Sequence, residues 1–164
     1  MNFRDRVVLF FATGSFVGKI PGAPGTFGSV LALPLCFVLS RFHFVAAAAC
    51  IVIFIVFAVL VAHLAEIILN RKDPGCIVID EMAGQMVTLA GLPFGLMSAA
   101  AGFVVFRTLD VLKPFPIRLV EQKVRGGAGV VLDDVTAGIL GNILFRIAFY
   151  YMETAHVLDG KALS

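Results

Sequence analysis

Residues 44–69 read FVAAAACIVIFIVFAVLVAHLAEIIL, an apolar run whose polar interruptions, His63 and Glu66, both come near its end. An α-helix rises about 1.5 Å per residue, so a helix over this run is longer than the hydrocarbon core of a bilayer, which is about 30 Å thick. We therefore predict a transmembrane helix from Phe44 to Leu69. This prediction decides the fold class of the chain.

The composition of the chain agrees with a membrane protein. Of 164 residues, 60% are apolar and 15% are charged, and the mean hydropathy is +0.99. An ordinary soluble domain has roughly a quarter of its residues charged. The length suits one membrane-embedded domain, residues 1–164. The three cysteines show no metal-binding spacing. Nucleic acid is not an expected partner, because no basic stripe with interleaved aromatic residues occurs.

The segments before the long apolar run predict two shorter helices. The first residues, with Arg4, Asp5 and Arg6, are expected to form an amphipathic segment in the lipid headgroups. The glycine- and proline-rich stretch at residues 18–28 cannot continue a helix. Thr26 or Ser29 is expected to cap a helix that runs to about Ser40, followed by a break at residues 41–43.

After the long run, a polar turn at residues 71–81 leads to a second apolar region, Met82 to Phe106, which contains a strong breaker at residues 91–95. This region is either one kinked span or two helices that turn back at the breaker, as a re-entrant hairpin. A polar loop from Arg107 to Asp134 then precedes a last apolar helix, Val135 to about Met152. The expected fold is an all-α, polytopic transmembrane bundle.

The positive charges favour one topology. If the chain turns at residues 41–43 and again at 91–95, most basic residues lie on one side, which the positive-inside rule makes cytoplasmic. Arg41 and Lys161 then lie on the other side, and Arg146 lies within the last helix with no role assigned. The residues expected on the cytoplasmic side are Arg4, Arg6, Lys19, Arg71, Lys72, Arg107, Lys113, Arg118, Lys123 and Arg125.

The same topology gathers the acidic residues on the cytoplasmic side, where two adjacent pairs adjoin apolar helices: Asp80-Glu81 and Asp133-Asp134. Carboxylates held close together repel one another, so a cation or protons must offset the charge. Mg²⁺ binds carboxylate oxygens together with water and substrate phosphate. One pair alone is equally consistent with helix capping, but two pairs together with Glu66 and Asp110 favour a metal site.

Two further motifs lie between the acidic pairs. Arg107, Asp110 and Lys113 share one helical face at i, i+3 and i+6, which is typical either of a surface ion-pair ladder or of an anionic-substrate site beside a metal. Pro114 and Pro116 end that helix. The glycines of residues 126–129 form either a flexible linker or a backbone cradle for phosphate at a helix N-terminus.

Four segments occur in order along the chain: GKIPGAPGTFGS at residues 18–29, DPGCIVIDEMAG at 73–84, FRTLDVLKPFPI at 106–117 and GGAGVVLDDVTAG at 126–138. Together they resemble the phosphatidylglycerophosphatase A family, and the resemblance extends over most of the chain. The resemblance implies Mg²⁺-dependent hydrolysis of phosphatidylglycerol phosphate to phosphatidylglycerol and phosphate, at the bacterial inner membrane. The phospholipid substrate and membrane lipids are the implied partners.

Site residues follow from the resemblance together with the residue chemistry. The expected metal ligands are Glu66, Asp80, Glu81, Asp133 and Asp134. The expected catalytic residues are Asp80, Glu81, Asp110, Lys113 and Asp134, and the expected substrate-binding residues are Arg107, Lys113 and Arg125. Attack on phosphorus by water and attack by an aspartate are both open.

Two other functions are weighed against this one. A CDP-alcohol phosphatidyltransferase also places aspartates and Mg²⁺ at the membrane face. In this chain, however, Asp133-Asp134 is followed by Val-Thr-Ala-Gly, without the DG and AR sequence elements and the further aspartates of that family. A small divalent-cation transporter would need acidic residues deep within its spans, whereas most of these acidic residues adjoin helix ends. The sequence makes no prediction of the oligomeric state.

Overall fold

The computed structural model describes the backbone of residues 1–162 and the side chains of residues 1–151, so the side chain of Lys161 lies outside the described part. Within residues 1–162 the regular secondary structure is entirely helical, which confirms the predicted all-α class. The elements are α1 (Phe3–Ala12), the 3-10 helix η1 (Val17–Lys19), α2 (Pro24–Leu39), α3 (Phe44–Leu69), α4 (Ile79–Thr88), α5 (Leu96–Leu112), α6 (Ile117–Lys123) and α7 (Gly127–Ala162).

Two helices are long and apolar enough to cross a membrane, α3 over its whole length and α7 over Gly127–Tyr151. Only 22% of the most apolar window of α3 is buried inside the protein. Large apolar side chains such as Val52, Ile53 and Leu60 are therefore exposed along this helix. A continuous apolar face of this size is costly in water and is accommodated by lipid.

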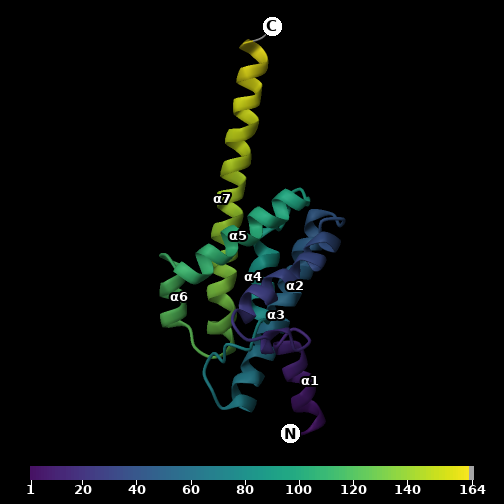
Figure 1. The fold of residues 1–164 in the computed structure, drawn as a ribbon, viewed down its shortest axis with the longest axis vertical. Coiled ribbons are helices and arrows are strands. Elements are labelled where there is room, and N and C mark those ends of the chain that lie inside the picture. The colour runs from purple at the N-terminus through teal and green to yellow at the C-terminus, as the bar shows by residue number, and fades with distance from the viewer. Residues whose placement is uncertain (163–164) are drawn as a thin grey trace.

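The helix α4 lies at the centre of the bundle and packs against α2, α3, α5 and α7, most extensively against α7 (Figure 1). Its neighbour α5 runs antiparallel to it, because Arg107 lies beside Glu81 whereas Gly102 lies beside Gln85 and Leu89. The apolar region after residue 82 is therefore two helices and not one kinked span. Gly91, with φ +67°, lies in the turn that joins them.

Asn142 and Arg146 on α7 form hydrogen bonds with backbone carbonyl groups at the end of α4. The Asn142 amide donates hydrogen bonds to the carbonyl oxygens of Thr88 (3.0 Å) and Ala90 (2.9 Å). Arg146 donates to Asn142 Oδ1 (2.8 Å) and to the Ala90 carbonyl (3.2 Å). These side chains satisfy carbonyl groups that the last turn of a helix leaves without partners. The structure thus gives Arg146 a structural role that its sequence position did not reveal.

The turn at residues 41–43 and the turn at residues 91–95 lie at the same end of the bundle, as the predicted topology requires. Residues of both turns line one cavity, among them Phe42 of the first turn and Leu92 and Pro93 of the second. The opposite end carries the N-terminus, the loop between α3 and α4, the helix α6 and the start of α7 (Figure 1).

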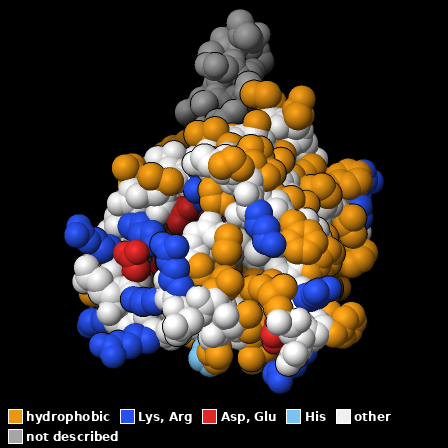
Figure 2. Space-filling view, turned by 60° about the horizontal axis from the view of Figure 1, so that its bottom comes forward, with side chains coloured by type: hydrophobic (Ala, Val, Ile, Leu, Met, Phe, Trp, Pro, Cys, Tyr) orange, Lys and Arg blue, Asp and Glu red, His pale blue; other side chains and the backbone are white. Residues whose placement is uncertain are grey.

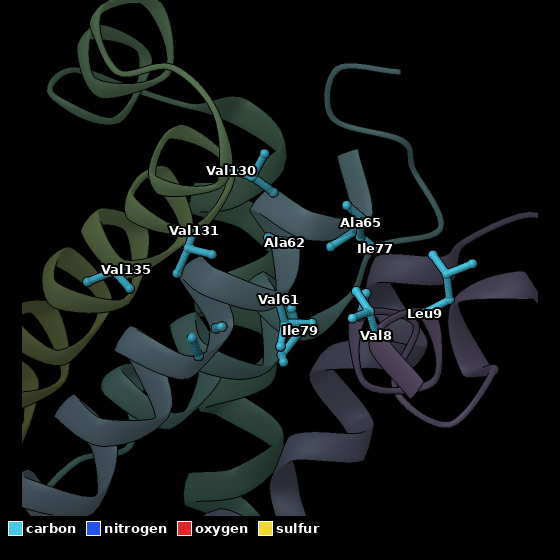
Figure 3. Packing of buried hydrophobic residues seen from close by; sticks show 13 residues of the cluster. Val8, Leu9, Val61, Ala62, Ala65, Ile77, Ile79, Val130, Val131 and Val135 are labelled. Carbon is cyan, nitrogen blue, oxygen red and sulfur yellow. The ribbon is translucent and has the colours of Figure 1, made fainter. Parts of the chain in front are cut away.

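A hydrophobic core joins four helices near that opposite end (Figure 3). Val8 and Leu9 of α1 lie on one side of it, and Val131 and Val135 of α7 lie on the other, with Val61 of α3 between them. This packing fixes α1 against α3. The N-terminal segment predicted to be amphipathic is therefore docked on the bundle through one face, while Phe3 on another face is exposed.

Three helix boundaries differ from the prediction. First, α2 begins at Pro24, because proline is favoured in the first helical turn, and Thr26 and Ser29 lie inside the helix instead of capping it. Second, much of the predicted polar loop at residues 107–134 is helical, as the end of α5, α6 and the start of α7. Third, α7 begins at Gly127 and not at Val135, because its first turns pack against α3 and α6.

Candidate active site

The helices α4 and α7 cross at close range beside the candidate site. A Cβ atom added at Gly138 would overlap the carbonyl oxygen of Gly84, and one added at Gly84 would lie 2.7 Å from the carbonyl oxygen of Asp134. Small residues let two helix backbones approach in this way. The approach brings the first turn of α4, which carries Asp80 and Glu81, against the second turn of α7, which carries Asp134.

Asp80, Glu81 and Asp134 form a three-carboxylate cluster, in which one oxygen of each residue lies within 4.8 Å of the others. Asp80 is 6% exposed and Asp134 is 4% exposed, so water solvates these charges poorly. The Glu81 N–H donates to Asp80 Oδ1 at 3.0 Å. Like charges this close and this buried repel strongly unless a cation or protons offset them. The structure thus brings together both residues of the first predicted acidic pair, Asp80 and Glu81, and one residue of the second pair, Asp134.

Arg107 on α5 is the cation beside this cluster. Its Nη1 lies 2.6 Å from Asp110 Oδ2 and 3.8 Å from Glu81 Oε1. Asp110 is itself buried and neighbours Glu81 and Asp134. The predicted helical face of Arg107 and Asp110 is therefore confirmed. These two residues are part of the acidic site and not an exposed ion-pair ladder.

Lys113 ends α5 and turns toward α7. Its Nζ donates to Asp133 Oδ2 at 2.6 Å and to Glu121 Oε1 at 2.9 Å. Burial lowers the pKa of Lys113, but the hydrogen bonds to Asp133 and Glu121 outweigh that effect, and the pKa lies above its ordinary value. Lys113 is therefore paired with Asp133, one residue of the second acidic pair, and with Glu121.

Glu66 and Arg125 lie outside the three-carboxylate cluster. Both line a separate cavity at the same end of the bundle, together with His63, Arg71 and Lys72. Glu66 Oε1 accepts a hydrogen bond from the N–H of Asp73 at 2.9 Å, which anchors the loop between α3 and α4. The grouping of Glu66 with the other predicted ligands is thus not what the structure shows.

The glycines of residues 126–129 are not a flexible linker in this structure, and the alternative of a phosphate cradle stays a prediction. They start α7, and a Cβ atom at Gly127 would overlap the backbone of Val59 and His63 on α3. The missing side chain lets α7 pack directly on α3.

Basic side chains surround the end of the bundle that carries Asp80, Glu81 and Asp134, which we call the acidic end. Figure 2, which brings the lower end of Figure 1 forward, shows Lys and Arg side chains gathered around acidic side chains, with apolar side chains on the adjoining flank. Arg71, Lys72, Lys123 and Arg125 are all exposed. Clustered basic side chains of this kind attract anions.

Two residues of the site had no role in the sequence analysis. Gly25, in the first turn of α2, lies so close to Glu81 that a Cβ atom would overlap Glu81 Oε1 and lie 3.0 Å from Arg107 Nη1. The glycine-rich motif at residues 18–29 therefore forms one wall of the site. Gln85 is completely buried one turn after Glu81, and neither of its side-chain polar atoms has a hydrogen-bond partner among the residues that the structure describes.

The cluster fits a hard divalent cation. Two buried carboxylates and the partly buried Glu81 supply the oxygen ligands that Mg²⁺ prefers, and Arg107 lies beside Glu81. Glu81 Oε2 is buried and has no partner among the described residues. An unpaired carboxylate oxygen inside a three-carboxylate cluster is the feature that a bound cation would satisfy.

Comparison with known proteins agrees with this site. The family model for phosphatidylglycerophosphatase A matches residues 10–149, a range that includes every residue of the cluster. The chain belongs to the phosphatidylglycerophosphatase A family. Members of this family are lipid phosphate hydrolases by name, and the predicted resemblance is confirmed.

Similar curated proteins cover nearly the whole chain. Phosphatidylglycerophosphatase A of Escherichia coli is 35% identical over 142 residues, which are 85% of this chain and 83% of that protein. The Haemophilus influenzae protein of the same name is 34% identical over 149 residues, 86% of this chain and 88% of that one. A putative phosphatidylinositol-3-phosphatase of Bacteroides thetaiotaomicron is 34% identical over 147 residues, 85% of this chain and 92% of that one. No solved structure gives a significant match.

Proposed function

We propose that this chain hydrolyses phosphatidylglycerol phosphate to phosphatidylglycerol and inorganic phosphate, with Mg²⁺ as its cofactor. The observation that carries the proposal is the buried cluster of Asp80, Glu81 and Asp134 beside Arg107. The names of two relatives supply the substrate. In the reaction, the bond between phosphorus and the glycerol oxygen breaks, and a new bond forms between phosphorus and the oxygen of water.

The cluster would hold the cation, and α5 would hold the phosphate. Asp80, Glu81 and Asp134 are the proposed ligands. A bound Mg²⁺ would supply Lewis acidity toward the phosphoryl oxygens and make a water molecule a stronger nucleophile. Arg107 offsets negative charge on the phosphoryl group, whose transfer depends chiefly on positioning and electrostatics. Asp110 orients Arg107 through their 2.6 Å contact.

The remaining predicted residues act around this centre. Lys113 neutralises Asp133 and fixes α6 to α7 at the edge of the site. Arg125, which is exposed, attracts the anionic headgroup rather than contacting the reacting phosphate. Glu66 orders the loop that leads into α4. We assign direct metal contact to neither Glu66 nor Asp133.

We also propose that the acidic end faces the cytoplasm of a bacterium, with α3 and part of α7 across the inner membrane. The exposed apolar face of α3 and the basic residues around the acidic end support this orientation. The acyl chains of the substrate would then remain in the bilayer while its phosphate enters the site from the headgroup region.

The test is release of phosphate by the purified protein in detergent, from phosphatidylglycerol phosphate, with Mg²⁺ and with excess EDTA. Release should require Mg²⁺ and collapse in Asp80→Asn, but it should persist in Asp5→Asn, which changes an acidic residue remote from the cluster. Phosphatidylinositol 3-phosphate is assayed in parallel because one relative is named for that lipid. A well-folded wild type that releases phosphate from neither lipid contradicts the proposal.

A further inference from the structure

A cavity of about 520 Å³ lies at the end of the bundle opposite the acidic end. The end of α2, the start of α3, the turn between α4 and α5, and Arg146 of α7 surround it. Its volume falls within the range of about 300–1,000 Å³ that is usual for sites of small organic ligands. The proposed reaction uses none of the residues that line this cavity.

The wall that α3 contributes changes from exposed to buried along the helix. Phe44 is 56% exposed, whereas Ala47 and Ile51, which also line the cavity, are 7% and 6% exposed. Ile51 lies about 10 Å beyond Phe44 along the helix axis. Because Phe44 begins the candidate membrane span, the open mouth of the cavity lies at one membrane boundary and its closed end points into the hydrocarbon region.

Arg146 supplies a positive charge at this mouth. A Cβ atom at Gly91 would lie 2.8 Å from the Phe44 ring and 3.1 Å from Arg146 Nη2, so the guanidinium is level with the start of α3. It donates to Asn142 and to the Ala90 carbonyl, but a guanidinium carries more N–H donors than these two bonds use. No carboxylate among the described side chains forms an ion pair with Arg146, so its charge is available to an anionic ligand.

A second cation, Arg41, lies beside the same mouth. Its chain neighbours Ser40 and Phe42 both line the cavity, and its guanidinium lies 4.7 Å from the centre of the Phe37 ring. Arg41 is exposed and has no carboxylate partner in the described part of the chain. Two such cations favour a ligand with net negative charge over a zwitterionic one. A cationic mouth above an apolar cavity matches an anionic headgroup with an attached acyl chain.

We infer that this cavity binds an anionic phospholipid, with its headgroup phosphate on Arg146 and one acyl chain along Ala47 and Ile51. Arginine pairs with phosphate through two parallel hydrogen bonds. The exposed apolar face of α3 is suited to lipid, so phospholipids are the anionic amphiphiles that reach the mouth from the bilayer. This site is remote from the carboxylate cluster, and the inference does not rest on the proposed function.

Fluorescence quenching by brominated lipids tests the inference. The chain contains no tryptophan, so Phe42→Trp introduces a single reporter at the mouth of the cavity. The variant is reconstituted in phosphatidylcholine vesicles that contain equal mole fractions of either phosphatidylglycerol or phosphatidylcholine with brominated acyl chains. Quenching should show binding of the anionic lipid that is stronger by about 5-fold, as expected for a basic residue near an anionic lipid. Ile53→Trp, on the exposed face of α3, is the control reporter and should show little headgroup preference.

Variants in the Phe42→Trp background separate lipid binding from structure. Arg146→Gln should abolish most of the headgroup preference, whereas Arg146→Lys keeps the charge and should retain much of it. Asn142→Leu also loses hydrogen bonds at the end of α4 but keeps the cation, so the preference should survive in it. Should Arg146→Gln not fold, Ala47→Leu takes its place, because it narrows the cavity and should weaken quenching by the anionic lipid.

Three results would overturn the inference. The first is equal quenching of the Phe42→Trp reporter by the two phospholipids. The second is a headgroup preference that Arg146→Gln leaves unchanged, or that Asn142→Leu abolishes as completely as Arg146→Gln does. The third is stronger quenching by a brominated fatty acid than by the anionic phospholipid, which would make a fatty acid the occupant.

Discussion

Nζ of Lys113, at the end of α5, lies 2.6 Å from Oδ2 of Asp133 on α7. The Asp133 side chain is 7% exposed and the Lys113 side chain is 25% exposed, so the pair is largely shielded from water. Twenty residues separate the two along the chain. This contact, together with the bond from Lys113 to Glu121, ties α5, α6 and α7 into one unit beside the carboxylate cluster.

Lys113→Met should destabilise the protein, because it leaves Asp133 buried without its cation. Removing one partner of a buried pair costs about 3–5 kcal/mol, and the partial exposure of Lys113 reduces the expected loss to about 1–3 kcal/mol. The measurement is thermal or denaturant unfolding in detergent. Asp133→Asn in the Lys113→Met background should recover part of the loss, whereas simple addition of the two losses would contradict the pairing.

The same pair predicts little pH dependence near neutrality. Since the folded-state pKa of Lys113 is raised, its contribution to stability is fully present below the unfolded lysine pKa of about 10.4. That contribution is lost only as the pH rises through the higher folded-state pKa. The stability difference between the wild type and Lys113→Met should therefore not shrink as the pH rises from about 7 to about 9. A difference that shrank within this range would show that the bond is not the source of the stabilisation.

Gly138→Ala should disrupt the crossing of α4 and α7. The new Cβ atom would overlap the Gly84 carbonyl, so the helices must separate, and overpacking of this kind costs about 1–3 kcal/mol. Because the crossing aligns Asp80 with Asp134, we expect phosphate release to fall at least as steeply as stability. Gly75→Ala is the control, since a Cβ atom there has no neighbour within 4 Å. Equal activity in the two variants would contradict the claim that the crossing of α4 and α7 aligns Asp80 with Asp134 for the reaction.

Arg107→Gln should lower kcat/KM for phosphatidylglycerol phosphate on the order of 100-fold, as expected when a positioned charge at a transition state is lost. Arg107→Lys keeps the charge without the forked geometry and should lose less activity. The control is Arg118→Gln, on the exposed surface of α6. Steady-state kinetics in mixed micelles provide the comparison, and normal kcat/KM in Arg107→Gln would exclude Arg107 from the phosphate site.

Asn142→Leu should destabilise the turn between α4 and α5, because the carbonyl groups of Thr88 and Ala90 lose hydrogen bonds of 3.0 and 2.9 Å. The expected loss is about 1–3 kcal/mol for unsatisfied buried groups. Since this turn lies at the opposite end from the carboxylates, activity at low temperature should remain. Ile143→Leu, at an exposed apolar position on the same helix, should behave as the wild type. Activity lost without any loss of stability would contradict the structural role.

Much of the helical framework follows from hydrophobicity and from chain breakers. The long apolar run predicted α3 with the bounds that the structure shows, and the breaks at residues 41–43 and 91–95 are both present. Hydrophobicity could not predict where α5 and α7 end at the polar side. These helices continue past the apolar boundary, because their polar turns pack against one another and not against lipid.

The residues of the candidate site were predictable in part, because Glu66 and Arg125 lie outside the cluster, and most of their contacts were not. Adjacent acidic pairs at helix ends indicated the cluster, and the spacing of Arg107 and Asp110 indicated their contact. The pairing of Lys113 with Asp133 depends on how α5 meets α7, which local spacing does not encode. The role of Gly25 was missed for the same reason, because a residue without a side chain leaves no chemical signal of the wall that it forms.

In the proposed function, Asp80 on α4 and Asp134 on α7 act in one metal-dependent site. The most direct measurement is a double-mutant cycle of Mg²⁺-dependent phosphate release with Asp80→Asn, Asp134→Asn and the combined variant, each checked for folding. Residues that act as a unit are strongly non-additive, so the combined variant should be about as inactive as either single one. Losses that multiply in the combined variant, or full activity in Asp134→Asn, would contradict a shared site.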